Sequence, residues 1–326
     1  MKKNYFILAA AATLFAACAE TDVLVDLSEK ENAPKAIGFE TFADNITRAD
    51  EPTTKPLQNY HESFGVWAYK TTSQDAVMDN YQVKHNTSAW EYAGVSDQTL
   101  KYWDKKAAYS FYAYAPYAAS GVTESNGKIL IEEGDYAANE NLQTWGTTKN
   151  TEVKFSVSTD WMIAESISNH KDYSNPVSEV FSHIMSKFIV KLQSNVADTK
   201  INSVTVSNVY GTGSYDGDKW VVTVGNTTSI SAQSTVDNSL IIETAGTTYH
   251  AMEYLLIPAA VPPTFSVNYT VNGDTYNVEN VAIPEITTIE KNTSYELTVK
   301  IDLGVIEFTA VATDFSSTVD KTLDIK

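Results

Sequence analysis

The amino-acid sequence predicts an all-β protein built of two β-sandwich domains. Three observations lead to this fold class. Short segments that alternate apolar and polar residues recur roughly every 10 residues, helical periodicity is scarce, and two Asn-Gly pairs, Asn126-Gly127 and Asn272-Gly273, stand between alternating segments. Such a pair is the strongest short-range signal for a β-hairpin, because both residues tolerate the positive φ of a tight turn.

The N-terminus has the features of an export signal. It contains two lysines, an apolar run from Tyr5 to Ala17, and then Cys18, the only cysteine. A basic start before a short apolar run is typical of a secretory signal peptide, which we assign to residues 1–17. The ending LFAAC resembles a bacterial lipoprotein signal, which implies that Cys18 receives lipid and anchors the precursor to the cell outer membrane. An unused thiol in an ordinary signal peptide is the alternative.

Residues 18–48 are predicted to form a lipidated propeptide that contains one strand. In the segment IGFETF, the side chains of Ile37, Phe39 and Thr41 fall on one side, which is the period of a half-buried strand. The segment lies shortly before Arg48, the only arginine among the 23 lysine and arginine residues.

Arg48 is predicted to be a proteolytic processing site. It stands among small and polar residues, and exposed segments of that composition are where proteolysis concentrates. A protease that recognises a guanidinium and rejects an ammonium would cut the chain once, between Arg48 and Ala49. This cut would remove the lipid together with the strand before it. Composition bias is the alternative explanation for a single arginine.

The remainder is predicted to form an N-terminal sandwich over residues 49–185 and a C-terminal sandwich over residues 186–326. Long polar connections are predicted at 71–89 and 132–150. The segments predicted to form strands are 62–70, 107–116, 122–131, 152–158, 187–193, 201–209, 218–225, 239–244, 264–283 and 294–312.

The C-terminal tail, STVDKTLDIK, permits two interpretations. Val319, Leu323 and Ile325 share one face, which Lys321 interrupts. The tail is either an edge strand of its own domain or a donor strand for another molecule. Withdrawal of a strand leaves unpaired backbone groups and an uncovered apolar trough, and a donor strand satisfies both.

Composition and motifs exclude several functions. The formal net charge of −18 argues against nucleic-acid partners. No serine-hydrolase, zinc-protease or phosphate-binding motif is present, so we predict neither an enzyme nor a cofactor. The five histidines never pair at ligand spacing, which predicts no metal site. His183 is expected to pack and form a hydrogen bond, and Asp216 and Asp218 are expected to flank a hairpin turn.

Several motifs carry a family resemblance across nearly the whole chain. They are the lipoprotein signal, TRA at 47–49, FGVWAY, KYWDKKAAYSFYAYAPY, FSHIMSKFIVKL, LLIPA and the late Asn-Thr-Ser-Tyr. In this combination the chain resembles the fimbrillin family of Bacteroidetes, the subunits of type V pili. The resemblance implies two transthyretin-like sandwiches and removal of the first strand by an arginine-specific surface protease, at a position that Arg48 matches.

The same resemblance implies partners and a location. A strand from the next fimbrial subunit would fill the groove that the first strand leaves. The protein would move from the outer membrane to a surface fimbria that supports adhesion to a host or bacterial ligand.

A surface glycan-binding lipoprotein is the alternative function. The chain holds six tryptophans and 19 tyrosines, and Trp90, Tyr92, Tyr102 and Trp103 are candidates for a sugar-stacking platform. Aromatic residues in strands are more often buried in a core. Exposure separates the two readings, because a platform needs two or three coplanar rings that face solvent.

Overall fold

The computed structural model consists of β-strands and one 3-10 helix, η2 (Leu57–Asn59), among the residues it describes. These are residues 34–43, 57–92, 98–135, 143–144, 159–234, 240–302 and 305–314. In this part of the chain, no helix has the length and apolar character needed to cross a membrane. The predicted all-β class is confirmed.

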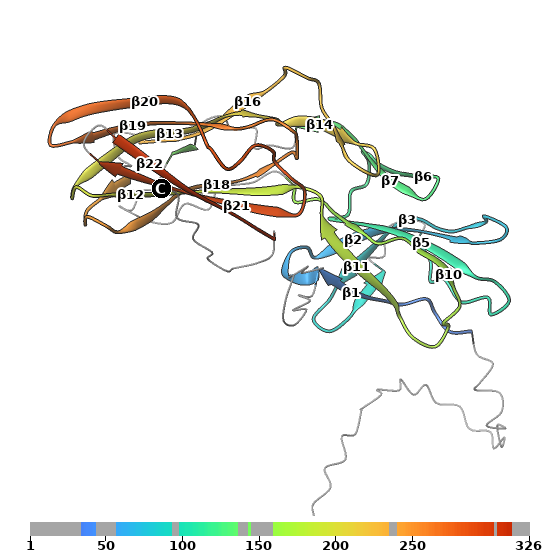
Figure 1. Cartoon of the computed structure of the whole chain (residues 1–326). Coiled ribbons are helices and arrows are strands. Elements are labelled where there is room, and N and C mark those ends of the chain that lie inside the picture. The colour runs from blue at the N-terminus through green and yellow to red at the C-terminus, as the bar shows by residue number, and fades with distance from the viewer. Residues whose placement is uncertain are drawn as a thin grey trace, which may run out of the picture. The chain divides into compact units, whose positions relative to one another are not determined.

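The first sheet joins eight strands in the order β10-β5-β2-β3-β4-β1-β11-β9 (Figure 1). The strands are β1 (Phe39–Ala43), β2 (Ser63–Lys70), β3 (Ala76–His85), β4 (Trp90–Tyr92), β5 (Tyr109–Ala115), β9 (Met162–Ala164), β10 (Ile167–His170) and β11 (Val177–His183). Strand β9 pairs with both β11 and β5. The sheet therefore closes into a ring of β5, β2, β3, β4, β1, β11 and β9.

Two further sheets face each other as a sandwich, and Figure 1 shows them as two layers. One has the order β18-β12-β21-β22, from β12 (Ser186–Ser194), β18 (Thr248–Leu256), β21 (Thr293–Asp302) and β22 (Val305–Asp314). The other has the order β20-β19-β13-β16-β8, with β17 also on β13. Its strands are β8 (Gln143–Thr144), β13 (Thr199–Val209), β16 (Thr228–Gln233), β17 (Leu240–Ile242), β19 (Thr264–Val271) and β20 (Asp274–Ala282). Inward side chains of both sheets form one apolar core.

A small fourth sheet has the order β15-β14-β7-β6. It consists of β6 (Val122–Ser125), β7 (Lys128–Asp135), β14 (Thr212–Tyr215) and β15 (Trp220–Val221). The predicted domain boundary at residues 185 and 186 falls between β11 and β12, yet this sheet takes strands from both sides of it. The division into two domains stays a prediction.

Both hairpins predicted from Asn-Gly pairs are present. Asn126 and Gly127 join β6 to β7 with φ of 52° and 78°. Asn272 and Gly273 join β19 to β20 with φ of 53° and 89°. The turn between β14 and β15, over residues 216–219, is the hairpin expected there; Asp216 accepts hydrogen bonds from the backbone N–H groups of residues 218 and 219.

Three predictions for chain segments are wrong. The connection predicted at 71–89 contains β3, which pairs along β2. The connection predicted at 132–150 contains the end of β7 and all of β8. In the strand predicted at 218–225 only Trp220 and Val221 are extended in a ladder, because the chain then turns away and leaves Val224 91% exposed. The strand predicted at 152–158 lies outside the described residues.

Candidate functional site

The candidate site is the place that β1 occupies between β4 and β11. The predicted residues Ile37, Phe39 and Thr41 lie within the described part of the chain. Tyr92, a candidate for the glycan platform, is described by its backbone alone. The predicted site residues that lie outside the described residues are Cys18, Arg48, Ala49, Val319, Leu323 and Ile325.

Strand β1 buries one complete face. Ile37, Phe39, Thr41 and Ala43 are 1%, 6%, 5% and 1% exposed, whereas the intervening Glu40 is exposed. The alternation follows from the period of two, because successive side chains point to opposite sides of a strand. We call the space that these four side chains fill, with the strand edges beside it, the β1 slot.

The backbone of β1 is held on both sides. It pairs in parallel with β11 through five residues, from Phe39 with Val177 to Ala43 with Phe181. On the other side only Phe39 pairs with Trp90 of β4. Just before the strand, the N–H of Ile37 donates to the carbonyl of residue 101 at 2.8 Å. β11 is therefore the principal partner of β1.

An aromatic cluster forms the apolar floor of the β1 slot. The ring of Phe39 meets Phe64 and Phe111 edge to face, at centroid distances of 5.5 and 6.1 Å. Phe64 in turn contacts Phe181 at 5.5 Å and Trp90 at 5.1 Å. Burial of Ile37 and of Phe39 stabilises the fold by about 1.5–3 kcal/mol each. Without β1, the face of these rings that Phe39 now contacts would be exposed to solvent.

One polar pair interrupts this apolar surface. Thr41 on β1 lies opposite Glu179 on β11, and Glu179 is 0% exposed. Thr41 Oγ1 and both carboxyl oxygens of Glu179 have no hydrogen-bond partner among the described residues. Burial raises the pKa of Glu179 to about 8. Glu179 was not predicted from the sequence, although the alternation in VSEVFSH places it on the same face as Val177 and Phe181.

His183, at the end of β11, packs as predicted. Its ring is 1% exposed, and Nδ1 lies 2.9 Å from Asp160 Oδ1. Tyr60 meets the ring edge to face at 5.1 Å. Burial lowers the pKa of the nearby His61. These contacts join η2, β11 and the start of β9, and they form a structural cluster.

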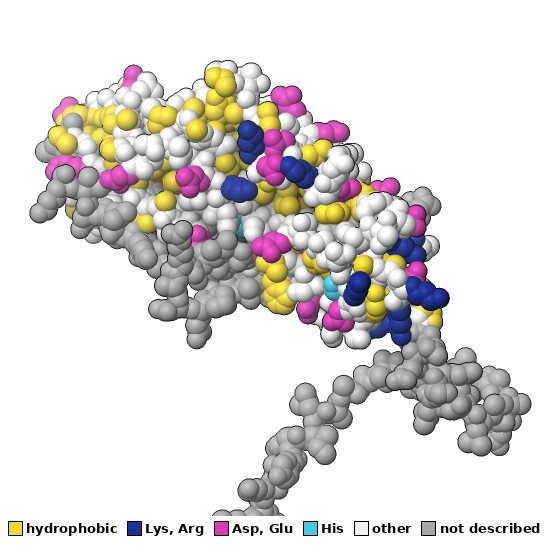
Figure 2. Space-filling view, turned by 45° about the vertical axis from the view of Figure 1, so that its right-hand side comes forward, with side chains coloured by type: hydrophobic (Ala, Val, Ile, Leu, Met, Phe, Trp, Pro, Cys, Tyr) yellow, Lys and Arg dark blue, Asp and Glu magenta, His cyan; other side chains and the backbone are white. Residues whose placement is uncertain are grey.

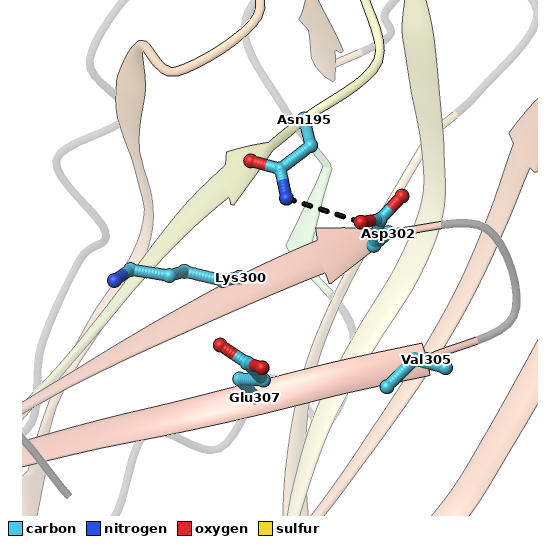
Figure 3. A pocket seen from close by; sticks show the side chains of 5 residues that line it. All are labelled: Asn195, Lys300, Asp302, Val305 and Glu307. Carbon is cyan, nitrogen blue, oxygen red and sulfur yellow. Dashed lines mark hydrogen bonds between the residues drawn. The ribbon is translucent and has the colours of Figure 1, made fainter. Parts of the chain in front are cut away.

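No cofactor site is evident in the described part of the chain. Within it, no group of three histidine, cysteine or acidic side chains is arranged to hold a metal ion. A shallow pocket of about 370 Å³ lies at the turn between β21 and β22. Figure 3 shows Asn195 donating to Asp302 there at 3.2 Å, with Lys300 and Glu307 beside them. The lining consists of four polar or charged surface residues and Val305.

The aromatic residues proposed as a glycan platform are not presented together. Trp103 is 6% exposed and packs edge to face on Tyr109 at 4.9 Å. Trp90 is partly buried against Phe64. Of these candidate rings, Tyr102 is 48% exposed. Trp90, Tyr102 and Trp103 therefore do not make the coplanar exposed set that sugar stacking needs.

Comparison with known proteins shows the family to which this chain belongs. A family model described as fimbrillin-like matches residues 47–320. The chain belongs to the fimbrillin-like family. The resemblance predicted from the sequence is thereby confirmed, and the matched region begins after β1. No curated protein matches the chain.

Solved structures share the fold. A fimbrial protein from Bacteroides vulgatus ATCC 8482 superposes with a TM-score of 0.61 at 18% identity, covering 86% of this chain and 100% of its own. A candidate cell adhesion protein from Bacteroides ovatus ATCC 8483 gives a TM-score of 0.61 at 16% identity, covering 88% and 100%. Another from Bacteroides uniformis ATCC 8492 gives 0.53 at 17% identity, covering 87% and 99%.

Membership of the fimbrillin-like family supports the role of a fimbrial subunit at the cell surface and points to a structural, non-enzymatic protein. Figure 2 shows acidic side chains spread over the visible face, with lysines in smaller groups. A formal net charge of −18 makes copies of the chain repel one another electrostatically.

Proposed function

We propose that this fimbrillin-like chain is exported as a lipoprotein, lipidated at Cys18, cut between Arg48 and Ala49, and polymerised into a surface fimbria by strand exchange. The observation that carries the proposal is the position of β1. It lies before Arg48 in the sequence, buries a full face in the β1 slot, and is one member of a closed ring of strands. A single cut would separate it covalently from every strand that it contacts.

Loss of β1 would create a strong site for a replacement strand. β11 would present unpaired N–H and C=O groups, and the cluster around Phe64 would lose the cover of Phe39. A donor strand with three or four apolar side chains gains about 1.5–3 kcal/mol for each and about 0.5–1.5 kcal/mol for each ladder hydrogen bond. The exchange is hard to reverse because the original strand is no longer attached.

The donor in this proposal is the C-terminal tail of another subunit, with Val319, Leu323 and Ile325 facing inward. The tail follows β22, an edge strand that pairs with β21 alone among the described strands. The last described residue before the tail, Asp314, therefore stands on an edge strand of the sandwich. An exposed edge is a suitable place from which to offer a segment to a neighbour.

The proposed partners follow from these steps. They are fimbrial subunits of the same or a related type, an arginine-specific surface protease, the outer membrane through the lipid before maturation, and a host or bacterial surface ligand of the filament.

The test is proteolysis of purified residues 19–326 beside an Arg48→Lys variant, which keeps the charge and removes the guanidinium. An arginine-specific protease should cut the native sequence and remove residues 19–48, which are about 30 residues. The cut chains should form an oligomer ladder in unheated detergent gels, and the Arg48→Lys variant should show neither result. A single cut without a ladder would overturn assembly by strand exchange. No cut at Arg48 would overturn the maturation step as well.

A further inference from the structure

Among the described residues, Glu179 has no partner that accounts for an acidic side chain at its buried position. A carboxyl group that is buried without a hydrogen-bond partner destabilises a fold, and an apolar residue of similar size would avoid that penalty. β1 offers it only Thr41, whose hydroxyl is also without a partner among the described residues. The β1 slot therefore fits the ring of Phe39 well. It fits Thr41, two positions later, poorly, because Thr41 and Glu179 do not satisfy each other.

The C-terminal tail carries a basic residue on an otherwise apolar face. With a period of two, Val319, Lys321, Leu323 and Ile325 fall on one side, and a lysine stands where an apolar residue would extend the face. A buried lysine alone is as unfavourable as a buried glutamate alone. Together they form a charge-assisted hydrogen bond, which is stronger than a bond between neutral groups.

Resting on the strand exchange proposed above, we propose that Lys321 of one subunit binds Glu179 of the next and so fixes the register of the donor strand in the β1 slot. With Lys321 in the place of Thr41, the donor's apolar residues reach the apolar parts of the slot. A two-residue slip would put Lys321 beside Val177 or Phe181 and leave Glu179 unpaired. The ion pair therefore selects one register among those that the apolar alternation alone would permit.

Side-chain size also gives the direction of the donor. Along β1 the slot receives Ile37, Phe39, Thr41 and Ala43, in that order. A tail that runs opposite to β1 supplies Ile325, Leu323, Lys321 and Val319 to the same four places, so the larger apolar groups enter the larger spaces. The same-direction alternative would put Val319 in the place of Phe39 and Leu323 in the place of Ala43.

The reversed direction also improves the backbone pairing. β1 runs parallel to β11, its principal partner. A reversed donor would run antiparallel to β11, and antiparallel pairs are slightly more stable per residue. The exchange would then replace a parallel strand and an unpaired glutamate by an antiparallel strand and an ion pair.

Cysteine cross-linking tests the register, because Cys18 is the only native cysteine and lies before Arg48. Residues 19–326 carrying Val177→Cys are mixed with the same chain carrying Leu323→Cys or Ile325→Cys, so that Glu179 and Lys321 stay in place, and each mixture is cut at Arg48 and oxidised. With Lys321 opposite Glu179, a reversed tail places Leu323 opposite Val177, whereas a two-residue slip that moves Lys321 beside Phe181 places Ile325 there. Directly opposed residues in a ladder lie within disulfide range, whereas diagonal neighbours lie farther apart. The Leu323→Cys mixture should give the dominant cross-link between subunits.

Exposed positions test the direction without disturbing the core. Ser178 is exposed on the outer face of β11. With Lys321 beside Glu179, a reversed tail places Thr322 opposite Ser178, and a same-direction tail places Asp320 there. Ser178→Cys should therefore cross-link to Thr322→Cys in preference to Asp320→Cys, and the reverse preference would overturn the direction.

Charge variants separate this inference from the proposed function. Lys321→Glu should lose the ladder, and Lys321→Glu combined with Glu179→Lys should regain it. A normal ladder from Lys321→Glu, or a dominant cross-link from Val177→Cys to Ile325→Cys, would overturn the pairing while strand exchange stands. If native-sequence chains cut at Arg48 form no ladder at all, strand exchange itself fails.

Discussion

Thr41 and Glu179 lie opposite each other in the parallel pairing of β1 with β11, and both side chains are buried without a hydrogen-bond partner among the described residues. This relationship joins the part of the chain before Arg48 to the sheet that remains after it. The destabilising contact belongs to the precursor, and a different strand can relieve it.

The precursor should become less stable as the pH rises through the range in which Glu179 ionises. Burial raises its pKa from 4.5 to about 8, so between these values the folded state binds more protons than the unfolded state. The free energy of unfolding therefore falls with rising pH in this window, by up to about 1.4 kcal/mol per pH unit. Urea unfolding midpoints between about pH 5 and about pH 8 measure it.

Glu179→Gln is the matched control for this pH dependence, because it keeps the size and removes the titration. The variant should be more stable than the native precursor near pH 8 and should show a smaller slope. An unchanged slope would mean that other groups cause the pH dependence.

Phe39→Ala should destabilise the precursor, and its effect should disappear once β1 has left the cleaved chain. The ring fills space between Phe64 and Phe111, and its loss should lower the free energy of unfolding by about 3–5 kcal/mol. Unfolding is measured before and after cleavage at Arg48. The exposed Glu40→Ala is the control and should have little effect. A difference that persists in the mature chain would show that β1 stays bound after the cut.

Gly65→Ala should destabilise the precursor through a steric clash in β2. A Cβ at this position would lie 2.2 Å from Tyr114 Cε1 and 2.8 Å from Asn80 Oδ1. Tyr114 is 0% exposed and its hydroxyl lies 2.9 Å from Asn80 Oδ1, so neither group moves freely. Overpacking of this kind destabilises by about 1–3 kcal/mol. Thermal unfolding measures it, with Gly38→Ala as control, since nothing lies within 4 Å of a Cβ there. Equal melting temperatures would contradict the clash.

Deletion of residues 317–326 should stop polymerisation without preventing folding or cleavage. The tail lies beyond β22, so the described sheets keep all of their strands. The truncated chain is cut at Arg48 and compared with the full chain in unheated detergent gels. If the truncated chain still forms a ladder, the donor strand lies elsewhere.

Local signals predicted much of this fold. The Asn-Gly turns and the strands that alternate strictly, such as β12 and β19, follow from period two and turn chemistry alone. β3 was missed because its buried residues Met78, Tyr81 and Val83 do not alternate strictly. The pairing with β2 shifts near Asn80, whose φ is 44°, so the chain gains a residue and the buried side changes.

The candidate site was only partly predictable for a related reason. The alternation of Ile37, Phe39 and Thr41 indicates a half-buried strand, but no local pattern tells which distant strand pairs with it. The parallel partner β11 lies far along the chain, and the alternation that puts Glu179 on the face of Val177 and Phe181 does not show that this face is buried beside β1. Register between distant segments is a tertiary property.

The closed ring of strands also sets the order of events in time. Because β9 pairs with both β5 and β11, the ring offers no open edge beside β11 while β1 is in place. A cut at Arg48 breaks one peptide bond and leaves the ladder between β1 and β11 intact. Departure of β1 is then a separate, slower step that an incoming strand must await. Cleaved chains should therefore accumulate as unpolymerised subunits before filaments grow. The delay between cleavage and filament growth measures how tightly β1 is held.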